Sequence, residues 1–133
     1  MELSDLVGTD EQLYRVMKRS KPEFITDDKV ISPALFKDSK GVSVDRDGGR
    51  TPDEIIRFIV EETFAKRAKA IVTVSAGFCF EIKAEVEAAP SDANPFHANI
   101  WLDKTNEQKR NLQALMLADQ CEVVYFNEEI EWV

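Results

Sequence analysis

Residues 51–54, Thr-Pro-Asp-Glu, carry the strongest local folding signal in this chain. The Thr51 hydroxyl can cap the first free amides of a helix, Pro52 suits the first helical position, and Glu54 can close a capping box. The next turns place apolar side chains on one side and charged ones on the other; the apolar set is Ile55, Ile56, Ile59, Val60 and Phe64. This pattern predicts an amphipathic helix that covers a sheet.

Short apolar and β-branched runs on both sides of that helix predict strands. They lie at residues 13–17, 41–45, 71–74, 78–86, 98–102 and 121–126. Within the run at 78–86, apolar and polar residues alternate strictly, which is typical of a long strand with one buried face. Residues 29–36 are also apolar but contain Pro33, and proline favours an edge strand or an extended segment.

A second helix is predicted after Thr105, which has capping-box spacing to Gln108. We expect this helix to end near residues 119–120 and to bury three apolar side chains, namely Leu112, Leu115 and Met116. The resulting order is strands, helix, strands, helix, strand. That order predicts an α+β fold, with a mainly antiparallel sheet and the two amphipathic helices packed on one face.

The 133 residues predict a single domain over 1–133, with residues 1–11 forming a mobile arm or a short turn. Ile130 and Trp132 alternate with acids in the tail, so an added edge strand there could pair with a second copy to form a homodimer. No apolar run approaches the roughly 18 residues that span a bilayer. The first residues lack the basic and apolar parts of a signal peptide, so we expect a cytoplasmic protein with no membrane partner.

The net charge is −8, and no lysine or arginine follows Arg110. Such a surface repels phosphate backbones, which argues against nucleic-acid binding and favours another protein, basic in character, as partner. The chain has one histidine and two widely separated cysteines, Cys79 and Cys121. These numbers exclude the common histidine and cysteine metal motifs, and no calcium-loop pattern occurs, so we expect no metal site.

The single histidine, His97, follows a proline-containing loop that begins with Asp92 and includes Asn94. His97 is a candidate general base that Asp92 could orient, and Asn94 is a candidate ligand-binding residue in the same segment. The interpretation that we favour, however, is a half-exposed histidine that hydrogen-bonds the backbone of its own loop.

Arg15 lies within the apolar run at 13–17, and a buried guanidinium needs a partner. An internal carboxylate or a phosphate-bearing ligand would serve, and we favour the carboxylate. Ser43, Asp45 and Arg46 precede a Gly-Gly turn and a helix N-terminus, which makes them further candidate ligand-binding residues. The spacing matches neither a P-loop nor a dinucleotide-binding glycine motif.

Two segments together resemble a group of small bacterial proteins with no assigned activity. The first spans residues 32–54 and includes a Ser-x-x-x-Phe run followed by Ser-Val-Asp; the second is Asn-Pro-Phe-His-Ala at 94–98. This resemblance covers about residues 12–102 and implies a bacterial source. The Leu-Tyr-Arg-Val run at 13–16 is also similar to a strand of ADP-ribosyltransferase-like toxin domains, whose arginine contacts NAD. Only Arg15 is carried over from that likeness.

Two functional hypotheses follow. The first is a non-enzymatic, acidic protein-binding domain, such as a bacterial immunity or defence-system accessory protein, which needs no cofactor. The second is a small ADP-ribosyltransferase-like or NAD-hydrolysing enzyme with NAD as cofactor. Arg15, Ser43 and His97 would be its candidate catalytic residues. The second hypothesis predicts that Arg15, Ser43 and an acidic side chain converge in one cleft.

Overall fold

The computed structural model describes residues 5–18, 24–26, 28–64 and 67–127. The described chain forms a six-stranded sheet in the order β4-β5-β2-β1-β3-β6, in which every neighbouring pair is antiparallel. The strands are β1 (Gln12–Lys18), β2 (Val42–Arg46), β3 (Ala68–Ser75), β4 (Glu85–Ala88), β5 (His97–Trp101) and β6 (Glu122–Phe126). The α-helices are α1 (Pro52–Phe58), which continues into the π-helical turn η3 (Ile59–Thr63), α2 (Ala76–Glu81) and α3 (Glu107–Gln120). The predicted α+β class and antiparallel sheet are confirmed.

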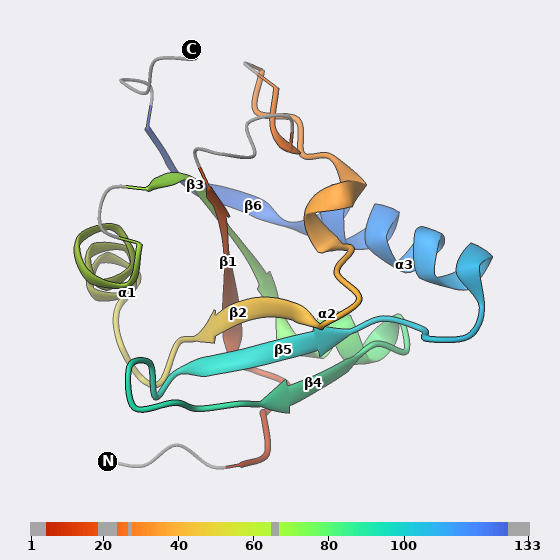
Figure 1. Ribbon diagram of the computed structural model, residues 1–133, viewed down its shortest axis with the longest axis horizontal. Helices are drawn as coiled ribbons and strands as arrows, with labels where there is room; N and C mark the ends of the chain where they lie inside the picture. Colours follow the sequence, from red (N-terminus) through yellow and green to blue (C-terminus); the bar gives the residue numbers. More distant parts are fainter. Residues whose placement is uncertain (1–4, 19–23, 27, 65–66, 128–133) are drawn as a thin grey trace.

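Strands β1 and β2 diverge soon after they meet. Their pairing covers only Leu13 with Arg46 and Tyr14 with Asp45, whereas β1 pairs with β3 along its whole length. Among the described residues, β1 is therefore paired only with β3 after Tyr14, and the residues of β2 that precede Asp45 are paired only with β5. In Figure 1, β1 runs steeply across the direction of β2 and β5. Within the described chain, this divergence leaves residues 42–44 of β2 without a neighbouring strand on that side.

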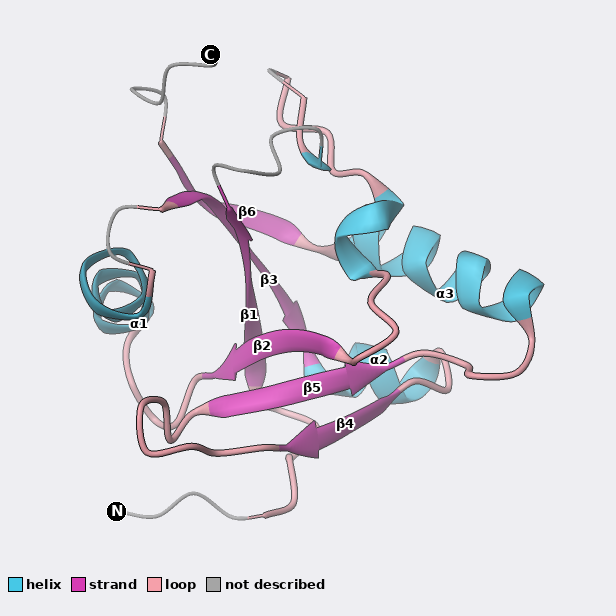
Figure 2. Ribbon diagram, in the orientation of Figure 1, coloured by secondary structure: helices cyan, strands magenta, loops and turns pink. Residues whose placement is uncertain are grey.

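The helices differ from the sequence prediction in their placement, because α1 and α3 lie on opposite faces of the sheet (Figure 2). Successive residues of a strand point to opposite faces. Leu13 packs in one apolar cluster with Leu117 of α3, whereas Tyr14 packs in a second cluster with Ile55 of α1. Strand β1 is thus covered on both faces, and the sequence patterns of the helices could not show which face each would cover.

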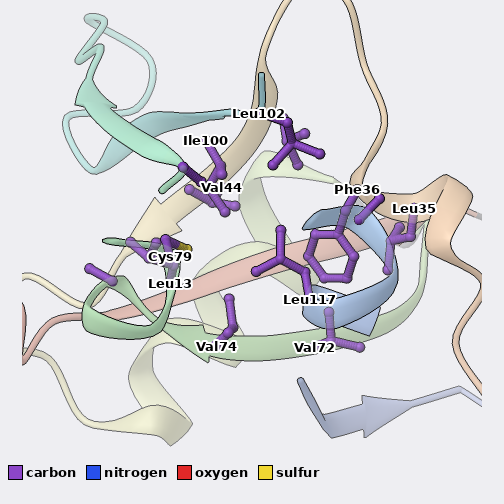
Figure 3. Close-up of a cluster of buried hydrophobic side chains, with 14 of the residues drawn as sticks. Leu13, Leu35, Phe36, Val44, Val72, Val74, Cys79, Ile100, Leu102 and Leu117 are labelled. Atoms are coloured by element: carbon purple, nitrogen blue, oxygen red, sulfur yellow. The ribbon is translucent and has the colours of Figure 1, made fainter. Parts of the chain in front are cut away.

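The larger cluster forms the main core, where Leu117 packs among side chains of β1, β3, α2 and the loop before β2 (Figure 3). Helix α3 does not bury the residues predicted from its sequence. Leu112 and Leu115 are 56% and 54% exposed, and Met116 is 38% exposed. The buried side is instead formed by Gln113, Ala114 and Leu117. Gln113 can be buried because its amide donates to the Ile82 carbonyl and accepts from the Asp103 amide.

The predicted long strand at 78–86 is also corrected. Residues 76–81 form helix α2, which is capped by the Ser75 side chain as it accepts from the Phe78 amide. Helical spacing buries Ala76 and Cys79, whereas the alternating pattern had placed Cys79 on the wet face. Only the end of the predicted run enters a strand, because β4 begins at Glu85.

Three smaller differences concern segment ends. Residues 33–36 form the 3₁₀ helix η2 (Pro33–Phe36), capped by Ser32, in place of the expected extended segment. Helix α3 is capped by Asn106 and so begins after the predicted cap. The carbonyls of Thr9 and Glu11 accept from the first amides of α2, which ties this part of the expected N-terminal arm to the domain. The expected edge strand at Ile130 and Trp132 lies outside the described residues.

Candidate functional site

A cleft of about 580 Å³ opens where β1 and β2 diverge. Its lining combines β1, η2, the middle of β2 and the chain around the start of β5. Five of the candidate residues line it, namely Arg15, Ser43, Asp45, Asn94 and His97. The volume lies in the range that is common for small-molecule sites. The structure therefore brings together the strand arginine, the Ser-Val-Asp segment and the histidine loop, which are far apart in the sequence.

Tyr14, Asp45 and His97 form a row across three strands. Asp45 of β2 is paired with Tyr14 of β1 on one side and with His97 of β5 on the other. Directly opposed residues in an antiparallel sheet share a face and lie close enough to interact. A phenol, a carboxyl group and an imidazole consequently stand side by side, and all three line the cleft.

Asp45 is the centre of this row and is only 6% exposed. Its Oδ1 accepts a hydrogen bond of 2.9 Å from the Asn94 side-chain amide, whereas its Oδ2 is buried without a hydrogen-bond partner among the described residues. Burial raises the pKa of the Asp45 carboxyl group, and the Asn94 hydrogen bond and the nearby charges of Arg50 and His97 act against that rise. A buried carboxylate oxygen without a partner is unfavourable, and such groups occur where a ligand or a proton is handled.

The histidine loop holds its side chains through hydrogen bonds to itself. His97 Nδ1 lies 2.9 Å from the Ala89 carbonyl, which can only accept, so this nitrogen carries the proton. In the neutral ring, Nε2 is then the acceptor, and none of the described residues donates to it. Asn94 uses its Oδ1 to accept from the Phe96 amide while its nitrogen donates to Asp45. The backbone of the loop, and not Asp92, therefore orients the imidazole.

Arg15 is held by backbone carbonyls and has no carboxylate within ion-pair distance among the described residues. Its Nε donates to the Leu35 carbonyl at 3.1 Å and its Nη1 to the Ser43 carbonyl at 3.0 Å. The Ser43 carbonyl lies on the side of β2 from which β1 has diverged, so the guanidinium takes the place of a strand neighbour. Burial lowers the pKa of Arg15, and the charge of Asp38 acts in the opposite direction. The expectation of an internal carboxylate partner was wrong, and the guanidinium retains further donors.

Arg46 does not join the cleft. Its Nε and Nη2 donate to the two carboxylate oxygens of Glu11 at 2.8 and 2.9 Å, and its side chain is 3% exposed. This bidentate pair fastens the segment before β1 to β2. The Arg46 guanidinium is used in the structure of the domain, on the opposite face of β2 from Asp45.

The cleft also contains residues that the sequence reasoning did not select. Cationic Lys18 and Lys37 line it, as do aromatic Tyr14, Phe24 and Phe64. Tyr14 adjoins Arg15, but strand alternation directs the two side chains to opposite faces of β1, so no local pattern indicated that both would line one cleft. No local pattern indicated that the lysines and phenylalanines would line the cleft. Their position there depends on how the chain is arranged beyond the ends of the strands.

Within the described segments, no three histidine, cysteine or acidic side chains are grouped closely enough to bind a metal ion. The same residues contain no helix with the length and apolar character needed to cross a bilayer. Comparisons of this chain with protein-family models, curated proteins and solved structures found no match.

Proposed function

We propose that this protein is a cytoplasmic binder of a small anionic ligand that carries a planar ring, of the nucleotide class. The observation that supports the proposal is the convergence of Arg15, Ser43, Asp45, Asn94 and His97 on one cleft. Titratable and cationic groups that converge in a cavity are candidates for a functional site. The side chains that line the cleft, and not the overall acidity of the chain, support this ligand class.

The charges in the cleft favour an anion. Among the described residues, three cationic side chains line it, Arg15, Lys18 and Lys37, against two acids, Asp38 and Asp45. The chain as a whole has a net charge of −8, so the excess of positive side chains in the cleft is opposite in sign to the charge of the whole chain. Phosphate or carboxylate groups are the usual partners of such cations.

The aromatic side chains favour a ligand with a ring. Phe24 and Phe64 are half-buried in the lining of the same cleft and offer apolar and aromatic surface beside the charged groups. Tyr14 also lines the cleft, although it is only 4% exposed. NAD combines phosphates with planar rings, and the likeness of residues 13–16 to an NAD-contacting strand makes it the first compound to test. The acid–base groups Asp45 and His97 would be available for transfer or hydrolysis of such a ligand.

The experiment is isothermal titration calorimetry with NAD, ADP-ribose and AMP, followed by an assay for release of nicotinamide. We expect NAD to bind and Arg15→Ala and Lys37→Ala to weaken binding at least tenfold. Lys40→Ala is the matched control, because Lys40 is exposed on the same loop and does not line the cleft. Binding of none of the three compounds, or equal binding by the cleft variants, would contradict the proposal.

The second candidate function is protein binding, and the exposed side of α3 favours it. Leu112, Leu115 and Met116 form an exposed apolar stripe at helical spacing, with Asp119 one turn further on. An amphipathic helix with basic flanks would match this stripe and the charge of the chain. Leu115→Asp should abolish binding of a partner captured by the wild type, whereas Lys40→Ala should retain it. Capture that is unaffected by Leu115→Asp would exclude this surface.

A further inference from the structure

The least satisfied polar atom of the cleft is Asp45 Oδ2. The Asp45 side chain is 6% exposed, lines the cleft and offers this oxygen without a hydrogen-bond partner among the described residues. Loss of hydration at a carboxylate oxygen is unfavourable unless a donor replaces the water. A group that enters the cleft with a suitable hydrogen would supply that donor.

Most donors near Asp45 are already engaged, and none except the Asn94 amide donates to it in the described structure. On the loop before β5, the Asn94 amide donates to the other carboxylate oxygen, Oδ1. On β5, the protonated nitrogen of His97 is directed to the Ala89 carbonyl. From the turn before α1, Arg50 uses Nε and Nη2 on the Asp47 and Arg46 carbonyls. Tyr14 of β1 is the remaining titratable neighbour, and no hydrogen bond from it to Asp45 occurs in the described structure.

Resting on the function proposed above, we infer that Asp45 is a specificity residue whose free Oδ2 accepts a hydrogen bond from an N–H group of the ligand. The cleft would then select an anionic ligand whose ring end carries a carboxamide or amino group. A carboxylate at the same place would be rejected, because it offers no donor and repels the carboxyl group of Asp45.

The competing role for Asp45 is structural. The Cζ atom of Arg50 lies 3.5 Å from the centre of the Phe96 ring. Its Nη1 is also buried without a hydrogen-bond partner among the described residues. The charge of Arg50 reaches Asp45, although no ion pair between them lies within 4.0 Å. If Asp45 served chiefly to balance Arg50, its neutralisation would destabilise the unliganded protein. A ligand-binding carboxyl group predicts the opposite, since a buried charge would be removed.

The test compares NAD with nicotinic acid adenine dinucleotide, which differs only in having a carboxylate in place of the carboxamide. Calorimetry on the whole chain gives the dissociation constant of each compound for the wild type, Asp45→Asn and Asp53→Asn. We expect the wild type to prefer NAD about tenfold or more, and Asp45→Asn to lose most of that preference. Asp53→Asn is the control, because Asp53 is an exposed acid in the first turn of α1 and does not line the cleft.

Thermal unfolding without ligand supplies an independent measurement. We expect the midpoint of Asp45→Asn to equal or exceed that of the wild type; a clear fall would overturn the inference in favour of the structural role. Equal affinity of the wild type for the two dinucleotides, or a preference that survives in Asp45→Asn, would also overturn it. Failure of the wild type to bind either dinucleotide would overturn both the proposed nucleotide-class function and this ligand class. If the wild type binds both dinucleotides but does not prefer NAD, the role inferred for Asp45 is overturned and the proposed nucleotide-class function stands.

Discussion

Asp45 lies directly opposite His97 across the β2–β5 pair, with Tyr14 opposite Asp45 on its other side. The row depends on two separate strand registers, one between β1 and β2 and one between β2 and β5. The β1–β2 contact ends immediately beyond it, which opens the cleft beside these side chains. The short length of that strand contact therefore accounts for both the position of the acid–base row and the access to it.

The Glu11–Arg46 pair should make a large contribution to stability. Glu11→Gln leaves the nearly buried Arg46 guanidinium without its charged partner, and breaking a buried pair in this way costs about 3–5 kcal/mol. Urea unfolding should therefore show a loss toward the lower end of this range, because Glu11 retains 17% side-chain exposure. Glu61→Gln, at an exposed position of η3, is the control and should change the free energy of unfolding by less than about 0.5 kcal/mol. A loss as small as the control's would show that the pair is not formed in solution.

The same pair should make stability depend on acid pH. The Arg46 hydrogen bond lowers the pKa of Glu11 below its ordinary value of 4.5 in the folded protein. The stabilisation is therefore present above pH 4.5 and is lost as the pH falls through the lower, folded-state pKa. Unfolding curves recorded from pH 6 down to pH 2 should converge for the wild type and Glu11→Gln. Curves that remain parallel would contradict the direction of this shift.

Asp45 should show the opposite dependence. Burial raises its pKa above the ordinary value of 3.8, so the folded state holds the proton more tightly than the unfolded state does. Its favourable contribution is present below pH 3.8 and is lost as the pH rises through the folded-state pKa. Relative to Asp45→Asn, the wild type should lose stability between pH 4 and neutral pH. A stability difference that is constant over this range would argue against a raised pKa.

Two leucines on α3 provide a test of how the helix is oriented. Leu117 is fully buried, so Leu117→Ala should reduce the free energy of unfolding by about 2–5 kcal/mol. Leu115 is 54% exposed, so Leu115→Ala should change it by no more than about 0.5 kcal/mol. Chemical denaturation of the two variants measures both values. The reverse order would mean that the helix buries the side predicted from the sequence.

Arg15 should affect both the fold and the ligand. Arg15→Ala removes the donors to the Leu35 and Ser43 carbonyls. The Leu35 bond is part-buried, and a buried carbonyl left without a donor costs about 1–3 kcal/mol, whereas the exposed Ser43 carbonyl can bond to water instead. Arg15→Lys keeps the charge but cannot place two donors in the same planar arrangement. We expect Arg15→Lys to recover part of the stability and little of the NAD affinity. Full recovery of both by lysine would indicate that only the positive charge at this position matters.

The start of α1 could be predicted in atomic detail because its signals are local. Thr51 and Glu54 form the expected capping box, and Ile55 and Ile59 are buried as the spacing indicates. The α2 segment was misassigned because Phe78, Phe80 and Ile82 alternate like a strand. A single capping contact from Ser75 and burial of Cys79 favoured the helix instead. The prediction assigned the buried side of α3 to the wrong residues. Hydrophobicity alone did not indicate that Gln113 could be buried, because its burial depends on hydrogen bonds to distant residues.

The sequence by itself determined the α+β class, the helix cap at Thr51 and the residue types available for chemistry, because capping and periodicity act over a few neighbouring residues. Only the tertiary structure decided that Arg15, Asp45 and His97 share a cleft and that Arg46 is held by Glu11 outside it. Those contacts join segments 30 or more residues apart, and they depend on strand register and on the divergence of β1 from β2. A shift of one residue in either register would move Asp45 away from its neighbours in the row, and no local pattern specifies that register.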